Sequence, residues 1–141
     1  MPLPRLSLYR HPEAECSSTG YLQVFETSIE TWQVPSIESQ SFDLTFEQII
    51  ERLSQVPRIH TEPDGSFVWC GHSSTEVAWQ LYGMIYDRAE RVVRIELTGE
   101  CPQAQWLQLL DCLHPNGELI AFVIEFQRFV LARDLVHLLA C

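Results

Sequence analysis

Apolar residues along the chain follow two periods, one typical of helices and one typical of strands. Over Thr45–Gln55 they recur at the i, i+3, i+4, i+7 spacing, which places them on one side of a helix. Thr45 and Gln48 form a capping-box pattern at its start, and Pro57 ends it. A second helix is expected over Pro102–Leu113. Its predicted buried stripe consists of Trp106, Leu109, Leu110 and Leu113.

Between these helices the pattern predicts two β-hairpins. In the first, the turn sequence Pro63-Asp64-Gly65 separates Arg58–Glu62 from Ser66–Cys70. Placing Thr61 opposite Phe67 predicts two further pairs. These are Ile59 with Trp69 on one face and His60 with Val68 on the other.

The second hairpin is expected to join Glu76–Tyr86 to Val92–Thr98 through a polar loop at 87–91. With Tyr86 opposite Val92, Met84 would oppose Arg94 and Tyr82 would oppose Glu96. A slip of one residue would turn the charged side chains of the second strand into the core, so the hydrophobic pattern constrains the register. The predicted inward face is apolar on both strands: Val77, Trp79, Leu81, Ile85, Val93, Ile95 and Leu97.

The remaining segments complete an α+β fold. Glu118–Phe126 is apolar on both faces and is expected to be a strand inside a sheet, and a C-terminal helix is expected from Phe129 to Ala140. Residues 1–43 are an arm or a set of strands, with a strand expected over Tyr21–Glu26, and residues 44–141 are the main body. We therefore expect one domain, residues 1–141, with a twisted, mainly antiparallel sheet of about five to six strands and two or three helices on one face.

The net charge and the distribution of basic residues limit the kinds of partner that the protein is expected to bind. The chain has 141 residues and a formal net charge of −10. All nine basic residues are arginines scattered along the chain, whereas nucleic-acid binding requires clustered basic residues. We expect no nucleic-acid partner and no membrane partner. The apolar segment Leu119–Ala140 is interrupted by Glu125, Arg128, Arg133 and Asp134, so it is not expected to span a membrane.

The cysteines bear on the cellular compartment. There are five, an odd number, and the N-terminal sequence lacks the apolar stretch of a secretory signal. We expect reduced thiols and a cytoplasmic protein. The cysteine positions are Cys16, Cys70, Cys101, Cys112 and Cys141.

Two Cys-x-His pairs are candidates for metal binding or catalysis: Cys70 with His72, and Cys112 with His114. Zinc prefers four such ligands, but structural zinc sites favour cysteines two to four residues apart, so we expect no metal and no cofactor. Hydroxyl groups follow His72 at 73–75, where ordinary loop hydrogen bonds are favoured over a nucleophile. If Cys70, His72 and His114 shared a cleft, they would indicate a small-molecule-binding or hydrolytic protein.

Glu96 and Glu125 are candidates for acid–base chemistry, although a structural role is favoured for both. Glu96 is expected to face solvent beside Arg94. Glu125 lies in an apolar run and, if buried, would need Arg128 or Arg133 as a partner. There is no glycine-rich phosphate loop. The sequence therefore does not establish an enzyme, and a non-enzymatic role is favoured.

The outer face of the second hairpin is the strongest candidate for binding. It carries tyrosine, methionine and arginine, which are enriched in protein interfaces. We expect this face to bind a protein partner or a second copy of the chain. The candidate residues are Tyr82, Met84, Tyr86, Arg94 and Glu96. A basic toxin neutralised by the acidic surface ranks lower, because the carboxylates are spread widely. The order of elements resembles that of small dimeric secretion chaperones and some bacterial immunity proteins, but no residue motif accompanies this likeness.

Overall fold

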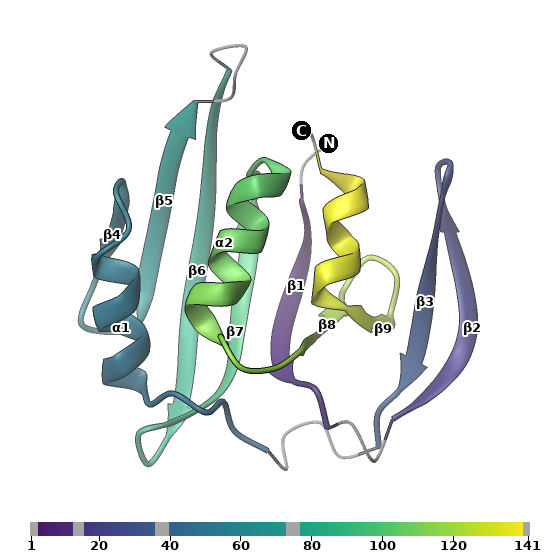
Figure 1. The fold of residues 1–141 in the computed structure, drawn as a ribbon, viewed down its shortest axis with the longest axis horizontal. Helices are drawn as coiled ribbons and strands as arrows, with labels where there is room; N and C mark the ends of the chain where they lie inside the picture. The colour runs from purple at the N-terminus through teal and green to yellow at the C-terminus, as the bar shows by residue number, and fades with distance from the viewer. Residues whose placement is uncertain (1–2, 13–15, 36–39, 73–76, 140–141) are drawn as a thin grey trace.

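All strands of the protein belong to one antiparallel sheet, seen in a computed structural model that describes residues 3–12, 16–35, 40–72 and 77–139 (Figure 1). The nine strands lie in the order β2-β3-β9-β8-β1-β7-β6-β5-β4. Their bounds are β1 Leu3–Arg10, β2 Ser17–Val24, β3 Thr27–Gln33, β4 Ile59–Thr61, β5 Ser66–His72, β6 Ala78–Arg88, β7 Arg91–Gly99, β8 Leu119–Val123 and β9 Arg128–Leu131. The α+β class and the antiparallel sheet are confirmed, but the prediction of five to six strands was too low.

Three helical elements of the described chain lie on one face of this sheet (Figure 1). They are α1 (Phe46–Ser54), α2 (Gln103–Leu113) and the 3-10 helix η3 (Ala132–Leu138). The capping box of α1 is present as predicted, since the Thr45 hydroxyl accepts from the Gln48 amide at 3.2 Å and the Gln48 side chain accepts from the Thr45 amide at 2.9 Å. On the opposite face of the sheet, which we call the open face, the described residues place no helix.

The predicted stripe of α2 faces the sheet. Trp106, Leu109 and Leu113 are buried, whereas Leu110 is half-buried and Cys112 is buried in its place. The indole Nε1 of Trp106 donates to the carbonyl of Ala132 at 2.8 Å, which ties α2 to the first residue of η3. The core thus lies between the helices and the inner face of the sheet.

The first hairpin has the predicted register. Ile59 pairs with Trp69, His60 with Val68, and Thr61 with Phe67.

The second hairpin has the predicted faces but not the predicted pairs. Tyr86 lies opposite Arg94, Met84 opposite Glu96, and Tyr82 opposite Thr98, so the register is shifted by two residues. The predicted polar loop at 87–91 was too long, because β6 continues to Arg88 and β7 begins at Arg91. The turn between them is Ala89 and Glu90, both with positive φ (51° and 69°), as a type I′ turn requires.

Next to this turn, the pairing of β6 with β7 is interrupted by a bulge. The register shifts between Tyr86 and Asp87, which lies opposite Val92. Val92 and Val93 are both buried. Val77, predicted to face inward, is instead 60% exposed just before β6.

The N-terminal segment is part of the sheet rather than a loose arm. β1 occupies an interior position between β7 and β8, and β2 and β3 form a hairpin at one edge. The strand expected over Tyr21–Glu26 is β2, which begins earlier, at Ser17, and ends at Val24.

The C-terminal helix prediction was wrong for its first turn. β8 ends at Val123, and the chain turns back to form β9 (Arg128–Leu131), with Gln127 at a positive φ of 54°. The apolar residues after β9 lie in η3, not in an α-helix. None of the helices in the described part of the chain is both long and apolar enough to cross a membrane.

Candidate functional site

The five residues predicted to bind a partner lie together on the open face. Tyr86 and Arg94 are directly opposite across β6 and β7, and the Arg94 guanidinium carbon lies 4.0 Å from the centre of the Tyr86 ring. The Tyr86 hydroxyl donates to Glu96 at 2.8 Å, and the Arg94 Nε lies 3.7 Å from the other oxygen of the same carboxylate. These three side chains hold one another in place, which lowers the entropy cost of binding through them.

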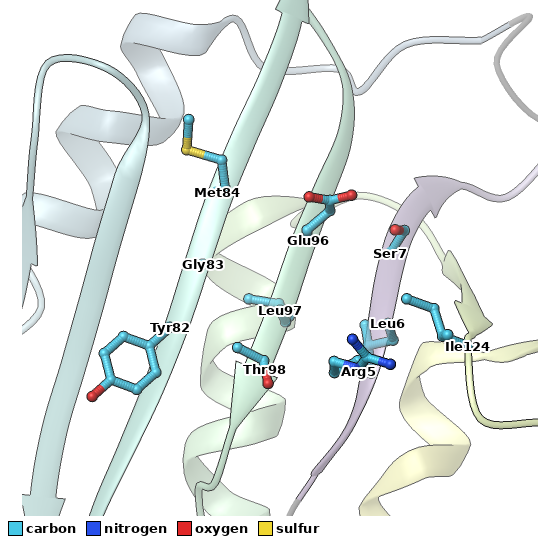
Figure 2. A pocket seen from close by; sticks show the side chains of 10 residues that line it. All are labelled: Arg5, Leu6, Ser7, Tyr82, Gly83, Met84, Glu96, Leu97, Thr98 and Ile124. Carbon is cyan, nitrogen blue, oxygen red and sulfur yellow. The ribbon is translucent and has the colours of Figure 1, made fainter.

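A groove lies beside these residues. Its volume is about 420 Å³, and β1, β6 and β7 supply nine of its ten lining residues (Figure 2). Tyr82 and Met84 project from β6, Glu96 and Thr98 from β7, and Ser7 from β1, with the helices lying behind the sheet (Figure 2). The complete lining is Arg5, Leu6, Ser7, Tyr82, Gly83, Met84, Glu96, Leu97, Thr98 and Ile124.

Apolar side chains flank the groove and charges of both signs border it. Tyr82 is 47% exposed and Ile124 is 38% exposed. Arg5 forms an ion pair with Glu125 at 3.3 Å, so Glu125 is an exposed residue of the β8–β9 turn and not a buried one paired with Arg128 or Arg133. The hydrogen bond to Glu96 raises the pKa of Tyr86, so this phenol stays protonated and keeps its donor role.

Arg5, Leu6 and Ser7 were missed from the sequence because β1 was not recognised as a strand, and Ile124 was missed because the turn after β8 was expected to be part of a strand. Arg5, Ser7 and Ile124 come from distant parts of the chain. The signal was the alternation of Leu6, Ser7 and Leu8, in which the leucines face the core. Two prolines in the first four residues obscured that signal.

The cleft that Cys70, His72 and His114 were expected to share is formed only in part. Cys70 and His72 line one pocket of about 380 Å³ with Trp69 and Trp79, and Gln105 and Gln108 of α2 complete it. Residues 73–75, whose hydroxyls were considered beside His72, lie outside the described residues. His114 lines other pockets, beside Pro115 and Gly117, so the three residues do not meet.

His114 is a core residue with one unpaired ring nitrogen. It is 4% exposed and packs edge-on against Phe42 at 5.8 Å between ring centres. Its Nδ1 is buried without a hydrogen-bond partner among the described residues. Burial lowers the pKa of His114, because the imidazolium is poorly solvated there.

This shift predicts a loss of stability in mild acid. The unfolded chain has the ordinary histidine pKa of 6.5, so below that pH the unfolded state binds the proton more tightly than the folded state does. Stability is therefore expected to fall as the pH drops through about 6.5 and below. Urea unfolding of the wild type and of His114→Phe, in neutral and in mildly acidic buffer, would measure it. The variant is expected to lose less stability than the wild type, and equal losses would contradict the assignment.

The two described cysteines of the core are not poised for reaction. Burial raises the pKa of Cys101 to about 12 and also raises that of Cys112, which keeps both as thiols. Within the ranges that the structure describes, no group of three or more histidine, cysteine or acidic residues is arranged to hold a metal ion. Cys141 lies outside those ranges.

Comparison with known proteins gives no relative for this arrangement. No family model matches the chain, and neither a curated protein nor a solved structure matches it.

Proposed function

We propose that this protein is a non-enzymatic binding module that contacts a partner protein through the groove on its open face. One observation carries the proposal. Side chains from β1, β6, β7 and the turn after β8 combine into a single groove on the side of the sheet without helices. Exposed apolar patches bordered by polar residues are typical of protein-interaction sites.

The chemistry of the groove indicates the kind of partner. Tyr82, Met84 and Ile124 offer apolar contact, and methionine adapts its shape to the group that meets it. Arg5 and Glu96 at the border offer polar contacts of both signs. The net charge of −10 favours a partner whose surface is basic around an apolar anchor, because opposite charge speeds association.

Substituting aspartate for Tyr82 and Met84 together is expected to weaken this binding strongly. Two carboxylates would have to lose water on contact with an apolar partner group, which weakens affinity about tenfold or more. A photo-crosslinking amino acid placed at position 82 would first capture the partner in cells. The captured protein would then be purified and its affinity measured for the wild type and for the Tyr82→Asp/Met84→Asp variant.

Leu107 supplies the matched control. It lies on α2, on the other side of the sheet, and is 44% exposed, close to the 47% of Tyr82. A crosslinker at position 107 should not capture the same protein, and Leu107→Asp should bind it as the wild type does. Equal affinity of the wild type and the double variant would overturn the proposal. A captured protein that proves to be the chain itself would show that the face serves a homodimer.

A second candidate function has one supporting observation. The pocket that contains Cys70 and His72 has space for a small molecule, and two tryptophans line it. This is the small-molecule-binding or hydrolytic alternative, reduced to two of its three expected residues. It ranks second because a catalytic Cys–His pair needs a third group to orient the base.

A further inference from the structure

The two edges of the sheet are built differently. At one edge, β4 has three residues, Ile59–Thr61. Pro57 and Arg58 precede it, and Glu62 and Pro63 follow it. Short edge strands bordered by proline and charge resist pairing with another chain. This edge is therefore protected.

The other edge lacks shortness, proline and charge as protections, and its one irregularity, a register shift between Ser18 and Gly20, leaves Tyr21–Val24 as a regular segment. β2 has eight residues, Ser17–Val24, and among the described residues it pairs with β3 on one side only. No proline and no charged residue occurs from Ser17 to Phe25. Tyr21 in its middle is 71% exposed. In Figure 1 the β2–β3 hairpin stands at the border of the molecule, beyond the helices.

We propose that β2 pairs antiparallel with β2 of a second copy of this chain, so that the two sheets become continuous. An edge strand carries a row of unpaired N–H and C=O groups, and an antiparallel pair related by a two-fold axis satisfies both rows in the same way. The exposed edge of β2 is therefore complementary to the same edge of a second copy. This surface is separate from the groove of the open face.

The distribution of charge favours contact between two copies at β2 over contact at other surfaces. Each copy carries a net charge of −10, so two copies repel over most approaches. The segment Ser17–Phe25 is uncharged, and the nearby Glu30 carboxylate accepts from Ser18 of its own chain at 2.8 Å.

This pairing has a geometric consequence for the groove. Residues directly opposite in an antiparallel pair point to the same side of the sheet. The helices of both copies would then lie on one side and both open faces on the other. Such a dimer presents two grooves in the same direction, as a bivalent surface.

Tyr21→Lys tests the pairing, with Phe25→Lys as its matched control. Both changes replace an exposed aromatic residue by lysine, at 71% and 76% exposure respectively, but Phe25 lies just beyond the strand. Lysine in the middle of an edge strand brings two positive charges together across the two-fold axis. Light scattering after gel filtration would follow a dilution series from about 1 mM to about 1 μM, the range of weak to moderate dimers.

The wild type and Phe25→Lys are expected to show twice the mass of one chain at high concentration. Tyr21→Lys is expected to show the mass of one chain, with a dimer dissociation constant raised about tenfold or more. Hydrogen exchange gives a second measurement: the amides of β2 that point away from β3 should be protected at high concentration and exposed at low concentration. Exchange also shows whether Tyr21→Lys remains folded.

Two results would overturn this proposal. One is a wild type that stays monomeric over the whole series, and the other is a dimer that Tyr21→Lys weakens no more than Phe25→Lys does. The Tyr82→Asp/Met84→Asp variant separates the two proposals, because it should lose the partner and keep the dimer. Tyr21→Lys should lose the dimer and still bind the partner at each groove.

Discussion

Replacing Gly99 by alanine is expected to destabilise the fold by about 4 kcal/mol, close to the upper end for single substitutions. Gly99 ends β7 with a φ of +118° and pairs with Leu3 of β1 and Leu81 of β6. A Cβ there would lie 2.3 Å from the carbonyl oxygen of Gln80. That oxygen also accepts from the Glu100 amide at 2.7 Å, so relief of the clash requires β6 to move.

Gly20→Ala is the matched control for this prediction. Gly20 has a similar φ of +115°, but a Cβ there meets no atom within 4 Å. It should lose only the strain of an unfavourable backbone conformation, about 1–2 kcal/mol. Urea unfolding of both variants in dilute solution gives the two free energies of unfolding. Equal losses would show that the contact with Gln80 is not what limits the residue at position 99.

Trp106→Ala is expected to cost about 4 kcal/mol, because it removes the largest fully buried side chain and leaves a cavity. The cavity would lie where α2 meets the sheet and η3. The substitution also removes the hydrogen bond from the indole N–H to the carbonyl of Ala132. Thermal and urea unfolding would measure the loss of stability.

Trp106→Phe separates the hydrogen bond from the packing. Phenylalanine fills much of the same space but has no N–H, so the Ala132 carbonyl would stay buried without this partner. A loss of about 1 kcal/mol is expected from the missing hydrogen bond. Leu107→Ala, at the exposed neighbouring position, should change stability by less than about 0.5 kcal/mol. A Trp106→Phe protein as stable as the wild type would contradict a structural role for the indole N–H.

The sequence predicted those elements whose signals are local. The helix after Thr45 has both a hydrophobic stripe and a capping box, and the turn at 63–65 sets the register of the first hairpin. Each of these features is confirmed because neighbours in the chain determine it.

The second hairpin shows what a hydrophobic pattern leaves undetermined. A slip of one residue exchanges the two faces, but a slip of two preserves them. The pattern therefore placed Tyr82, Met84 and Tyr86 on the correct face while giving each the wrong cross-strand partner. The deciding feature was the turn at Ala89 and Glu90, two non-glycine residues with positive φ. Alanine and glutamate rarely adopt positive φ, so their presence did not predict this turn.

The groove could be predicted only in part because its wall depends on a distant strand. Arg5 and Ser7 reach the site through the pairing of β1 with β7, more than 80 residues away along the chain. Propensity and periodicity act over a few residues and carry no information on such pairing. The C-terminal segment failed for a related reason: its leucine spacing suits a helix, yet β8 provides an edge that Arg128–Leu131 completes as β9.

The interior position of β1 has a consequence for how the protein forms. This strand joins the group β2-β3-β9-β8 to the group β7-β6-β5-β4. It is made before the other described strands, but its two neighbours end at Gly99 and Val123. During synthesis β1 therefore remains unpaired on both sides until β7 and β8 have been made. Pairing at such long range makes folding slow, and the newly made chain is expected to depend on protection from aggregation during that interval.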